Sequence, residues 1–281
     1  MLRSRLLVAA AALPPVLALV YVGGWPLCLL LVAAAVVGTT ELRALFDAAG
    51  IPAFWPAAFV AAPLLVLDAR WPDLGLARLV AAAALVAGLV WAVLQEVEPA
   101  RAVVGWGATL AASLYLGLPL GLALSLRSRD EAVGTALALG PLALSRGVLW
   151  LALALLLAWA CDTAAYSVGR ALGRRPFFQR ISPRKTLEGT VAGVVAAAAV
   201  GLAVGPSVGL APAYSVALGA VGGVAGVFGD LAESLLKRAG RGKDSGRLFP
   251  GHGGLLDRLD SLLFVFVVVY YGGELARTVG G

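Results

Sequence analysis

Long apolar runs recur along the chain and are separated by short polar connections. A helix needs about 20 apolar residues to cross the hydrocarbon core of a bilayer. The runs predict nine such spans, at residues 5–22, 25–39, 52–68, 78–95, 102–126, 147–168, 190–206, 212–229 and 259–273. A transmembrane barrel would need strands of about ten residues with alternating polarity. The unbroken runs therefore favour an all-α polytopic integral membrane protein.

The start of the chain has two interpretations. The first two apolar runs are short and flank Gly23-Gly24, so they could form a tight hairpin. Arg3 and Arg5 before an apolar run are also typical of a signal peptide. Because a second apolar run follows at once, we expect the first run to stay in the membrane.

Composition supports a protein that has lipid as part of its solvent. The 281 residues are 60% hydrophobic and 14% charged, whereas soluble domains are about 45–50% apolar and about 25% charged. The two cysteines, Cys28 and Cys161, both lie in apolar runs without a CxxC pair. They are expected to be small buried hydrophobic residues, and they give no support for a zinc site.

The distribution of the basic residues predicts an orientation. Residues 169–189 and 230–260 together carry twelve of the 22 Lys and Arg residues. Two predicted spans separate these stretches, so both emerge on one side, which the positive-inside rule makes cytoplasmic. We expect a multi-pass protein of the cytoplasmic (inner) cell membrane whose polar site faces the cytoplasm, with no nucleic acid as a partner.

The two halves of the chain differ in their polar residues. Residues 1–146 carry few of them outside short connections, and these are expected to be ordinary loop or interface charges: Glu41, Arg43, Asp47, Glu96 and Glu98. Residues 147–281 hold nearly every residue that suggests chemistry. We therefore expect N-terminal membrane helices for packing and a lipid groove (1–146), followed by a catalytic membrane region (147–281).

The densest polar cluster is GDLAESLLKRAGRGKDSGRLFPGHGGLLDRLDS, residues 229–261. It contains six Lys or Arg residues, the single histidine His252 and five carboxylates: Asp230, Glu233, Asp244, Asp257 and Asp260. Carboxylates bind hard divalent cations, whereas Lys and Arg bind phosphate oxygens. The turn PGHGG could offer backbone N–H groups to a phosphate. The alternative is a solvated loop with salt bridges.

Helical spacing groups the carboxylates of this cluster. Asp230, Glu233, Ser234 and Lys237 recur at i, i+3, i+4 and i+7, so one helical face presents them together. Asp257 and Asp260 are also three residues apart, at the entry to an apolar run. Two acidic helix faces could therefore meet there and share one or two metal ions.

Two upstream segments also carry candidate site residues. Asp162 ends an uncharged run of thirteen residues, where a carboxylate is costly unless paired, and Tyr166 one turn later could hydrogen-bond it. Its alternative role is a structural anchor to a loop cation. Ser182, Lys185, Thr186 and Glu188 form a polar loop before an apolar run. Thr186 or Glu188 could cap the next helix, or the helix start could bind a nucleotide phosphate.

The last cluster resembles the motif of CDP-diacylglycerol synthases (phosphatidate cytidylyltransferases). The matching positions are Ser234, Lys237, Arg238, Lys243, Asp244, Pro250, His252, Gly253, Gly254, Asp257, Arg258 and Asp260. CDTAAYSVGRALG (161–173) and ISPRKTLEG (181–189) resemble two further segments of that family. Arg184 stands where Lys is frequent, and Leu187 where Trp is frequent. The resemblance covers about residues 147–273.

The resemblance implies the reaction of CTP with phosphatidate to give CDP-diacylglycerol and pyrophosphate, in phospholipid biosynthesis. Asp230 and Asp257 would be the leading ligands of Mg²⁺, assisted by Ser234 and Asp260, with room for a second ion. Lys237, Arg238, Lys243 and Arg258 would bind phosphate oxygens, and His252 would act on the leaving pyrophosphate or be a structural turn residue. The rest of the implied site is Asp162, Tyr166, Ser182, Lys185, Thr186, Glu188, Asp244, Gly253 and Gly254.

Other interpretations stay open at this level. A related CTP-dependent enzyme acting on an ether or prenyl lipid would share the motif, because apolar residues decide lipid choice. An anion transporter would need charges near mid-span, but residues 190–206 and 212–229 are uncharged. The Gly- and Ala-rich stretch 190–229 suits a homodimer interface or packing within one chain.

Overall fold

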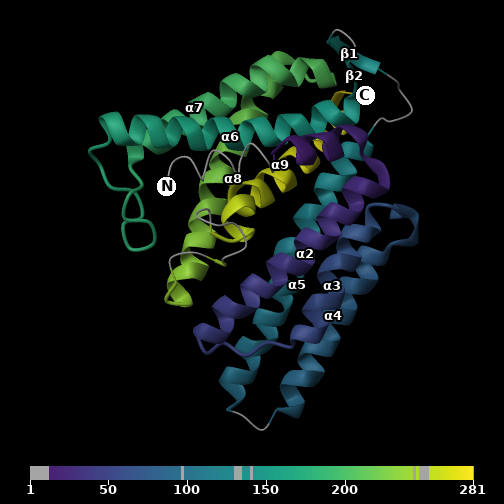
Figure 1. The fold of residues 1–281 in the computed structure, drawn as a ribbon, viewed down its shortest axis with the longest axis vertical. Helices are drawn as coiled ribbons and strands as arrows, with labels where there is room; N and C mark the ends of the chain where they lie inside the picture. The colour runs from purple at the N-terminus through teal and green to yellow at the C-terminus, as the bar shows by residue number, and fades with distance from the viewer. Residues whose placement is uncertain are drawn as a thin grey trace. The chain divides into compact units, whose positions relative to one another are not determined.

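The computed structural model describes residues 13–95, 98–129, 135–139, 142–242, 245–246 and 253–280. These ranges are mainly helical and contain one short antiparallel hairpin, β1 (Thr135–Leu139) with β2 (Leu142–Ser145). The helices are Leu13–Val22, α2 (Gly24–Ala48), α3 (Trp55–Asp68), α4 (Leu76–Leu94), α5 (Pro99–Ser128), α6 (Arg146–Leu172), α7 (Leu187–Val204), α8 (Pro212–Ala239) and α9 (Leu256–Gly280) (Figure 1). The predicted helical class is confirmed, and the hairpin is an addition to it.

Eight of the nine predicted spans each coincide with a helix, and the described part of the first, from residue 13 on, is helical as well. Seven helices of the described chain are long and apolar enough to cross a membrane: α2, α4, α5, α6, α7 with its 3₁₀ extension, α8 and α9. Helix α3 has 14 residues, which reach only about 21 Å at about 1.5 Å per residue. Leu13–Val22 is the part of the first predicted span that lies within the described residues. The chain is therefore a polytopic membrane protein with seven full-length candidate spans in its described part.

The chain divides into two compact units. The first comprises Met1–Leu124 and Leu236–Arg258, and the second comprises Ser125–Leu235 and Leu259–Gly281. Helices α5, α8 and α9 each contribute residues to both units. The sequence predicts a division of the chain by function, into packing helices (1–146) and a catalytic region (147–281). The two compact units do not test this division, which stays a prediction.

In the first unit, α5 packs closely against α2 and α3. A Cβ on Gly117 of α5 would lie 2.8 Å from the Cα of Ala62 on α3, and a Cβ on Gly38 of α2 would lie 2.9 Å from a Leu116 methyl group. Small residues thus let the helix backbones approach, as is common in membrane proteins. Leu116 is fully buried, which places the core of this unit along α5.

In the second unit, α7 packs against α6, and Figure 1 shows these two helices side by side. Close contacts between glycines of α8 and the backbone of α7 show that α7 also packs against α8. A Cβ on Gly219 of α8 would lie 3.1 Å from the Cα of Gly201 on α7. A Cβ on Gly189 of α7 would lie 2.9 Å from the Cα of Gly169 on α6. The Gly-rich faces of 190–229 are therefore used within one chain, and the homodimer stays a prediction.

Candidate functional site

Three carboxylates of the second unit meet between α8 and α9. Oxygens of Asp230, Glu233 and Asp260 all lie within 4.8 Å of one another. Gly229 makes this possible, because a Cβ there would lie 3.1 Å from the Cα of Ser261 on α9 and would also meet the Asp260 carbonyl. Asp230 and Glu233 follow at once on α8, so the close helix contact brings their side chains to Asp260.

The burial of this acidic cluster is unequal. Glu233 is fully buried, whereas Asp230 and Asp260 are partly exposed. The Ser234 hydroxyl donates to Asp230 Oδ1 at 3.4 Å. Three converging carboxylates offer the oxygen ligands that hard divalent cations prefer, so the residues fit a Mg²⁺ ion. Glu233 was not among the site residues expected from the sequence, although its spacing from Asp230 placed it on the same helical face.

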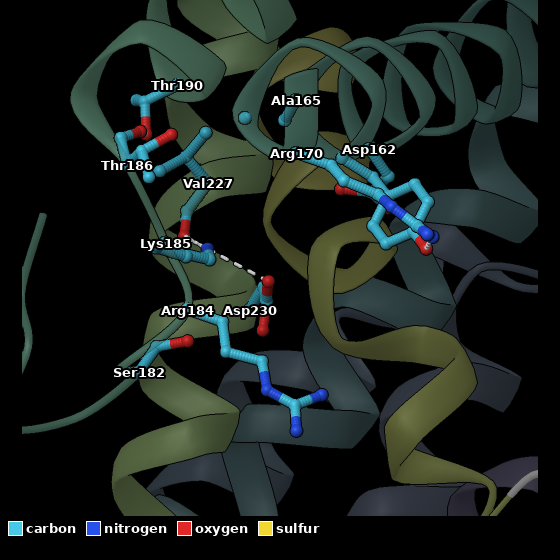
Figure 2. Close-up of a pocket in the computed structure, with 12 residues that line it drawn as sticks. Asp162, Ala165, Arg170, Ser182, Arg184, Lys185, Thr186, Thr190, Val227 and Asp230 are labelled. Atoms are coloured by element: carbon cyan, nitrogen blue, oxygen red, sulfur yellow. Dashed lines mark hydrogen bonds and ion pairs between the residues drawn. The ribbon is translucent and has the colours of Figure 1, made fainter. Parts of the chain in front are cut away.

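A cavity of about 510 Å³ adjoins the cluster, and Asp230 belongs to its wall. Residues of α6, α8 and the loop between α6 and α7 line it, among them Asp162, Tyr166, Arg170, Ser182, Arg184, Lys185, Thr186 and Asp230. Figure 2 shows the Lys185 ammonium reaching toward the Asp230 carboxylate, at 2.9 Å. The same ammonium donates to the Val227 carbonyl at 3.1 Å. Predicted residues from three segments are thus brought together around one cavity.

The α6–α7 loop is held by its own polar residues. Thr186 is the N-cap of α7, and its hydroxyl oxygen accepts the Gly189 N–H at 3.2 Å. The Glu188 carboxylate accepts the N–H groups of Arg174 at 3.1 Å and of Arg175 at 3.2 Å. The capping role considered for Thr186 is therefore confirmed, and Glu188 fixes the loop backbone. Contact of either residue with a substrate stays a prediction.

The partners of Asp162 and Tyr166 differ from those expected. The Ser261 hydroxyl donates to Asp162 Oδ1 at 3.2 Å. The expected bond between Tyr166 and Asp162 is replaced by another, because Arg170 donates to the Tyr166 hydroxyl at 2.9 Å. Tyr166 and Arg170 are four residues apart on α6, so their side chains lie on the same helical face. Both side chains still line the cavity.

Asp257 belongs to a separate network in the first unit. Its Oδ1 pairs with the Lys237 ammonium at 2.8 Å. Its Oδ2 accepts the Gly254 N–H at 2.8 Å, the Ser245 N–H at 3.0 Å and the Ser245 hydroxyl at 2.9 Å. Both carboxylate oxygens therefore have protein donors, and the expected metal-ligand role of Asp257 stays a prediction.

The remaining candidates lie around this network or outside the described residues. Arg238 and Arg258 are exposed on α8 and α9. Gly253 has a φ of +79°, which favours glycine, and a Cβ there would meet the Asp257 carboxylate. Three candidate site residues lie outside the described residues: Lys243, Asp244 and His252.

Comparison with known proteins connects this geometry to a family. The chain is 34% identical over 165 residues to a phosphatidate cytidylyltransferase of Bacillus subtilis, covering 58% of this chain and 56% of that protein. It is 39% identical over 128 residues to one of Synechocystis, covering 44% of this chain and 43% of that protein. The aligned stretches span about half the length of these relatives. A model of the cytidylyltransferase family matches residues 3–275, and the chain therefore belongs to the cytidylyltransferase family.

Proposed function

We propose that this protein transfers the cytidylyl group of CTP to phosphatidate, giving CDP-diacylglycerol and pyrophosphate. The observation that carries the proposal is the position of Asp230, which belongs both to the acidic cluster and to the wall of the cavity with its basic residues. A metal site and a phosphate-binding cavity that share one residue suit a reaction between two phosphates. Family membership and the names of the relatives support the same reaction.

Asp230, Glu233 and Asp260 are proposed to hold Mg²⁺. When bound, the ion would neutralise charge on the phosphates of the nucleotide. Ser234 supports this set, because it donates to Asp230. The sequence also predicts Asp257 as a Mg²⁺ ligand and allows for a second ion. We keep both as part of the proposal.

The chemical problem in this reaction is electrostatic. A phosphatidate oxygen attacks the α-phosphorus of CTP, and the bond between that phosphorus and the oxygen bridging to the β-phosphorus breaks. The attacking phosphate monoester is already an anion near neutral pH, since its second pKa is about 6, so a strong general base is unnecessary. Fixed cations that bind the phosphates lower the repulsion between the two reactants and stabilise the leaving pyrophosphate.

The cations that line the cavity support this proposal. Arg170, Arg184 and Lys185 line it together, and Lys185 is fixed by its contacts with Asp230 and the Val227 carbonyl. We assign Lys185 to a phosphate near the acidic cluster, and Arg170 and Arg184 to the other phosphates. Ser182 and Thr186 offer hydroxyl groups on the same wall. The acyl chains would stay in the bilayer while CTP enters from water.

The proposal is tested with purified protein, phosphatidate, Mg²⁺ and CTP labelled in the cytidine. We expect label in the lipid phase that depends on phosphatidate and is lost with EDTA and in Asp230→Asn. Label in an ether-linked or prenyl lipid instead would show that the protein is a cytidylyltransferase with a different lipid substrate. Folded protein that labels none of these lipids would refute the proposal.

A further inference from the structure

Glu41 of α2 is a buried carboxylate that bonds to a segment more than 200 residues later in the chain. Its Oε1 accepts the Leu255 N–H at 2.8 Å, and its Oε2 accepts the Leu256 N–H at 2.9 Å. The Ser245 hydroxyl oxygen lies 3.1 Å from Oε2 and 2.9 Å from Asp257 Oδ2, so its single proton is shared between the two carboxylates. All these residues belong to the first unit. Glu41 therefore caps the start of α9 from another helix, at N–H groups that lack partners within α9.

Two glycines leave room for this carboxylate. A Cβ on Gly246 would lie 2.5 Å from Glu41 Oε1, and a Cβ on Gly254 would lie 2.5 Å from the same oxygen. Any larger residue at either position would have to displace Glu41 or the loop. Gly254, which the sequence suggested for substrate binding, is thus required for the approach of Glu41.

The same face of α2 contacts the other end of the α8–α9 connection. Leu45 lies one turn after Glu41, and a Cβ on Gly240, just after α8, would lie 2.8 Å from the Leu45 carbonyl oxygen. Glu41 and Leu45 thus hold the two ends of the connection, at Gly240 and at residues 254–256. This connection carries much of the motif that resembles the family.

Ser245 links Glu41 to Asp257. Its hydroxyl lies 3.1 Å from Glu41 Oε2 and 2.9 Å from Asp257 Oδ2. Asp257 in turn pairs with Lys237 of α8 at 2.8 Å.

We propose that Glu41 is a positioning residue for the reaction: it fixes the start of α9 and, through Ser245, the orientation of Asp257. The expected fall in kcat rests on the proposed function. The structural role of Glu41, which is to fix the start of α9, does not depend on it. It assigns a role to the N-terminal half of the chain, where the sequence indicated only an ordinary interface charge. The anion bound by the described N–H groups at the start of α9 is then a protein carboxylate and not a phosphate.

The test compares Glu41→Gln and Glu41→Ala with the wild type in nanodiscs. Gln keeps one acceptor oxygen and the side-chain volume, so we expect activity to fall in the order Glu, Gln, Ala. In Glu41→Gln, kcat should fall about 10- to 100-fold, the scale for a small misplacement of reacting groups, with the KM for phosphatidate nearly unchanged. Hydrogen exchange at the amides of 253–258 should accelerate, while exchange in α4 stays as in the wild type.

Asp47→Asn is the matched control. It removes a carboxylate from the same helix, but the Asp47 side chain is 54% exposed and pairs only with its helical neighbour Arg43 among the described residues. This variant should keep wild-type kcat and exchange. A Glu41→Gln enzyme with wild-type kcat, or one that loses activity with unchanged exchange at 253–258, would overturn the proposal.

Ser245→Ala keeps the test decisive if the Glu41 variants fail to fold. It removes the link to Asp257 and leaves both backbone contacts of Glu41, so kcat should fall while the amides of Leu255 and Leu256 stay protected. Wild-type kcat in Ser245→Ala would refute the link. If the wild type transfers label to no lipid, the proposed function fails, whereas the exchange comparison still decides whether Glu41 holds α9.

Discussion

Asp257 and Asp260 of α9 lie one helical turn apart but have different neighbours. Asp257 is bonded to Lys237, Ser245 and Gly254, whereas Asp260 joins Asp230 and Glu233 in the acidic cluster. The same residue type thus has two different environments at the start of one helix. Donors around Asp257 favour an anchoring role, and the convergence of carboxylates around Asp260 favours a cation.

The first prediction at this scale concerns Glu233. Glu233→Gln keeps the volume of a fully buried side chain and removes its charge. We expect the Mg²⁺ concentration for half-maximal activity to rise about tenfold, equivalent to about 1.4 kcal/mol of binding free energy. A Mg²⁺ titration of activity measures this change. Glu98→Gln, at an exposed position before α5, is the control, and an unchanged titration in Glu233→Gln would remove Glu233 from the metal site.

The second prediction concerns Lys185. Lys185→Gln removes the ammonium that lies 2.9 Å from Asp230. We expect kcat to fall about 100-fold, the scale for losing one donor that stabilises a transition-state charge. Steady-state kinetics with CTP and phosphatidate provide the measurement. Arg180→Gln removes an exposed charge from the same loop, and an equal loss there would attribute the effect to total loop charge.

Helix α8 carries both the glycines that pack against neighbouring helices and two residues of the acidic cluster. Its glycines at 219 and 223 face α7, where their Cβ atoms would lie 3.0 Å from the Cα of Ala198 and 3.1 Å from the Cα of Val194. Gly229 faces α9, and the acidic residues follow directly. Because a helix surface is fixed in register, close packing at Gly229 determines the spacing of the acidic cluster one turn away.

This register gives a third prediction. Gly229→Ala places a methyl group against the backbone of Asp260 and Ser261, so it should destabilise the protein by about 1–3 kcal/mol, as overpacking does. It should also weaken Mg²⁺ activation, because the helices must separate. Thermal unfolding in detergent and a Mg²⁺ titration measure the two effects.

Gly226→Ala is the matched control, one turn earlier on the same helix. Its added methyl group would lie 3.4 Å from a Val265 methyl group, an ordinary contact. Since Ala is favoured over Gly in helices by about 1 kcal/mol, this variant should unfold at the wild-type temperature or higher. Equal losses in both variants would contradict the role given to Gly229.

At the scale of the whole molecule, seven helices of span length fix how the polar segments can lie in a membrane. Helix α7 with its extension, Leu187–Val208, is one of them. The basic α6–α7 loop and the short α7–α8 connection must then reach opposite sides of the bilayer. From the positive-inside rule we expect the α6–α7 loop to be on the cytoplasmic side.

The fourth prediction tests this topology. Arg180→Cys and Ala211→Cys place a thiol at exposed positions before and after α7. We expect a membrane-impermeant maleimide to label Arg180→Cys from the cytoplasmic side only and Ala211→Cys from the opposite side only. The native cysteines are fully buried and should stay unlabelled. Labelling of both variants from one side would show that α7 does not cross.

The helical membrane class, the positions of the seven span-length helices and the family motif could all be predicted from the sequence. Apolar periodicity and motif spacing are local properties, so they can be read without a fold. The sequence also placed Asp230 and Glu233 on one helical face, and it identified Lys185, Ser182 and Thr186 as one polar loop. The extent of α3 was overestimated by three residues at its start, because hydropathy cannot separate a short helix from its apolar connections.

Which distant residues contact each other could be learned only from the folded structure. Close backbone contact at Gly229 brings Asp260 to Asp230 and Glu233, and no local pattern marks that pairing. Glu41 acquires its role only because α2 packs against the start of α9, 214 residues later in the chain. From sequence alone, a lone carboxylate in an apolar helix is interpreted as an interface charge, because the N–H groups that donate hydrogen bonds to it are not known. Contacts between distant segments depend on how helices pack, and that packing is a property of the whole fold.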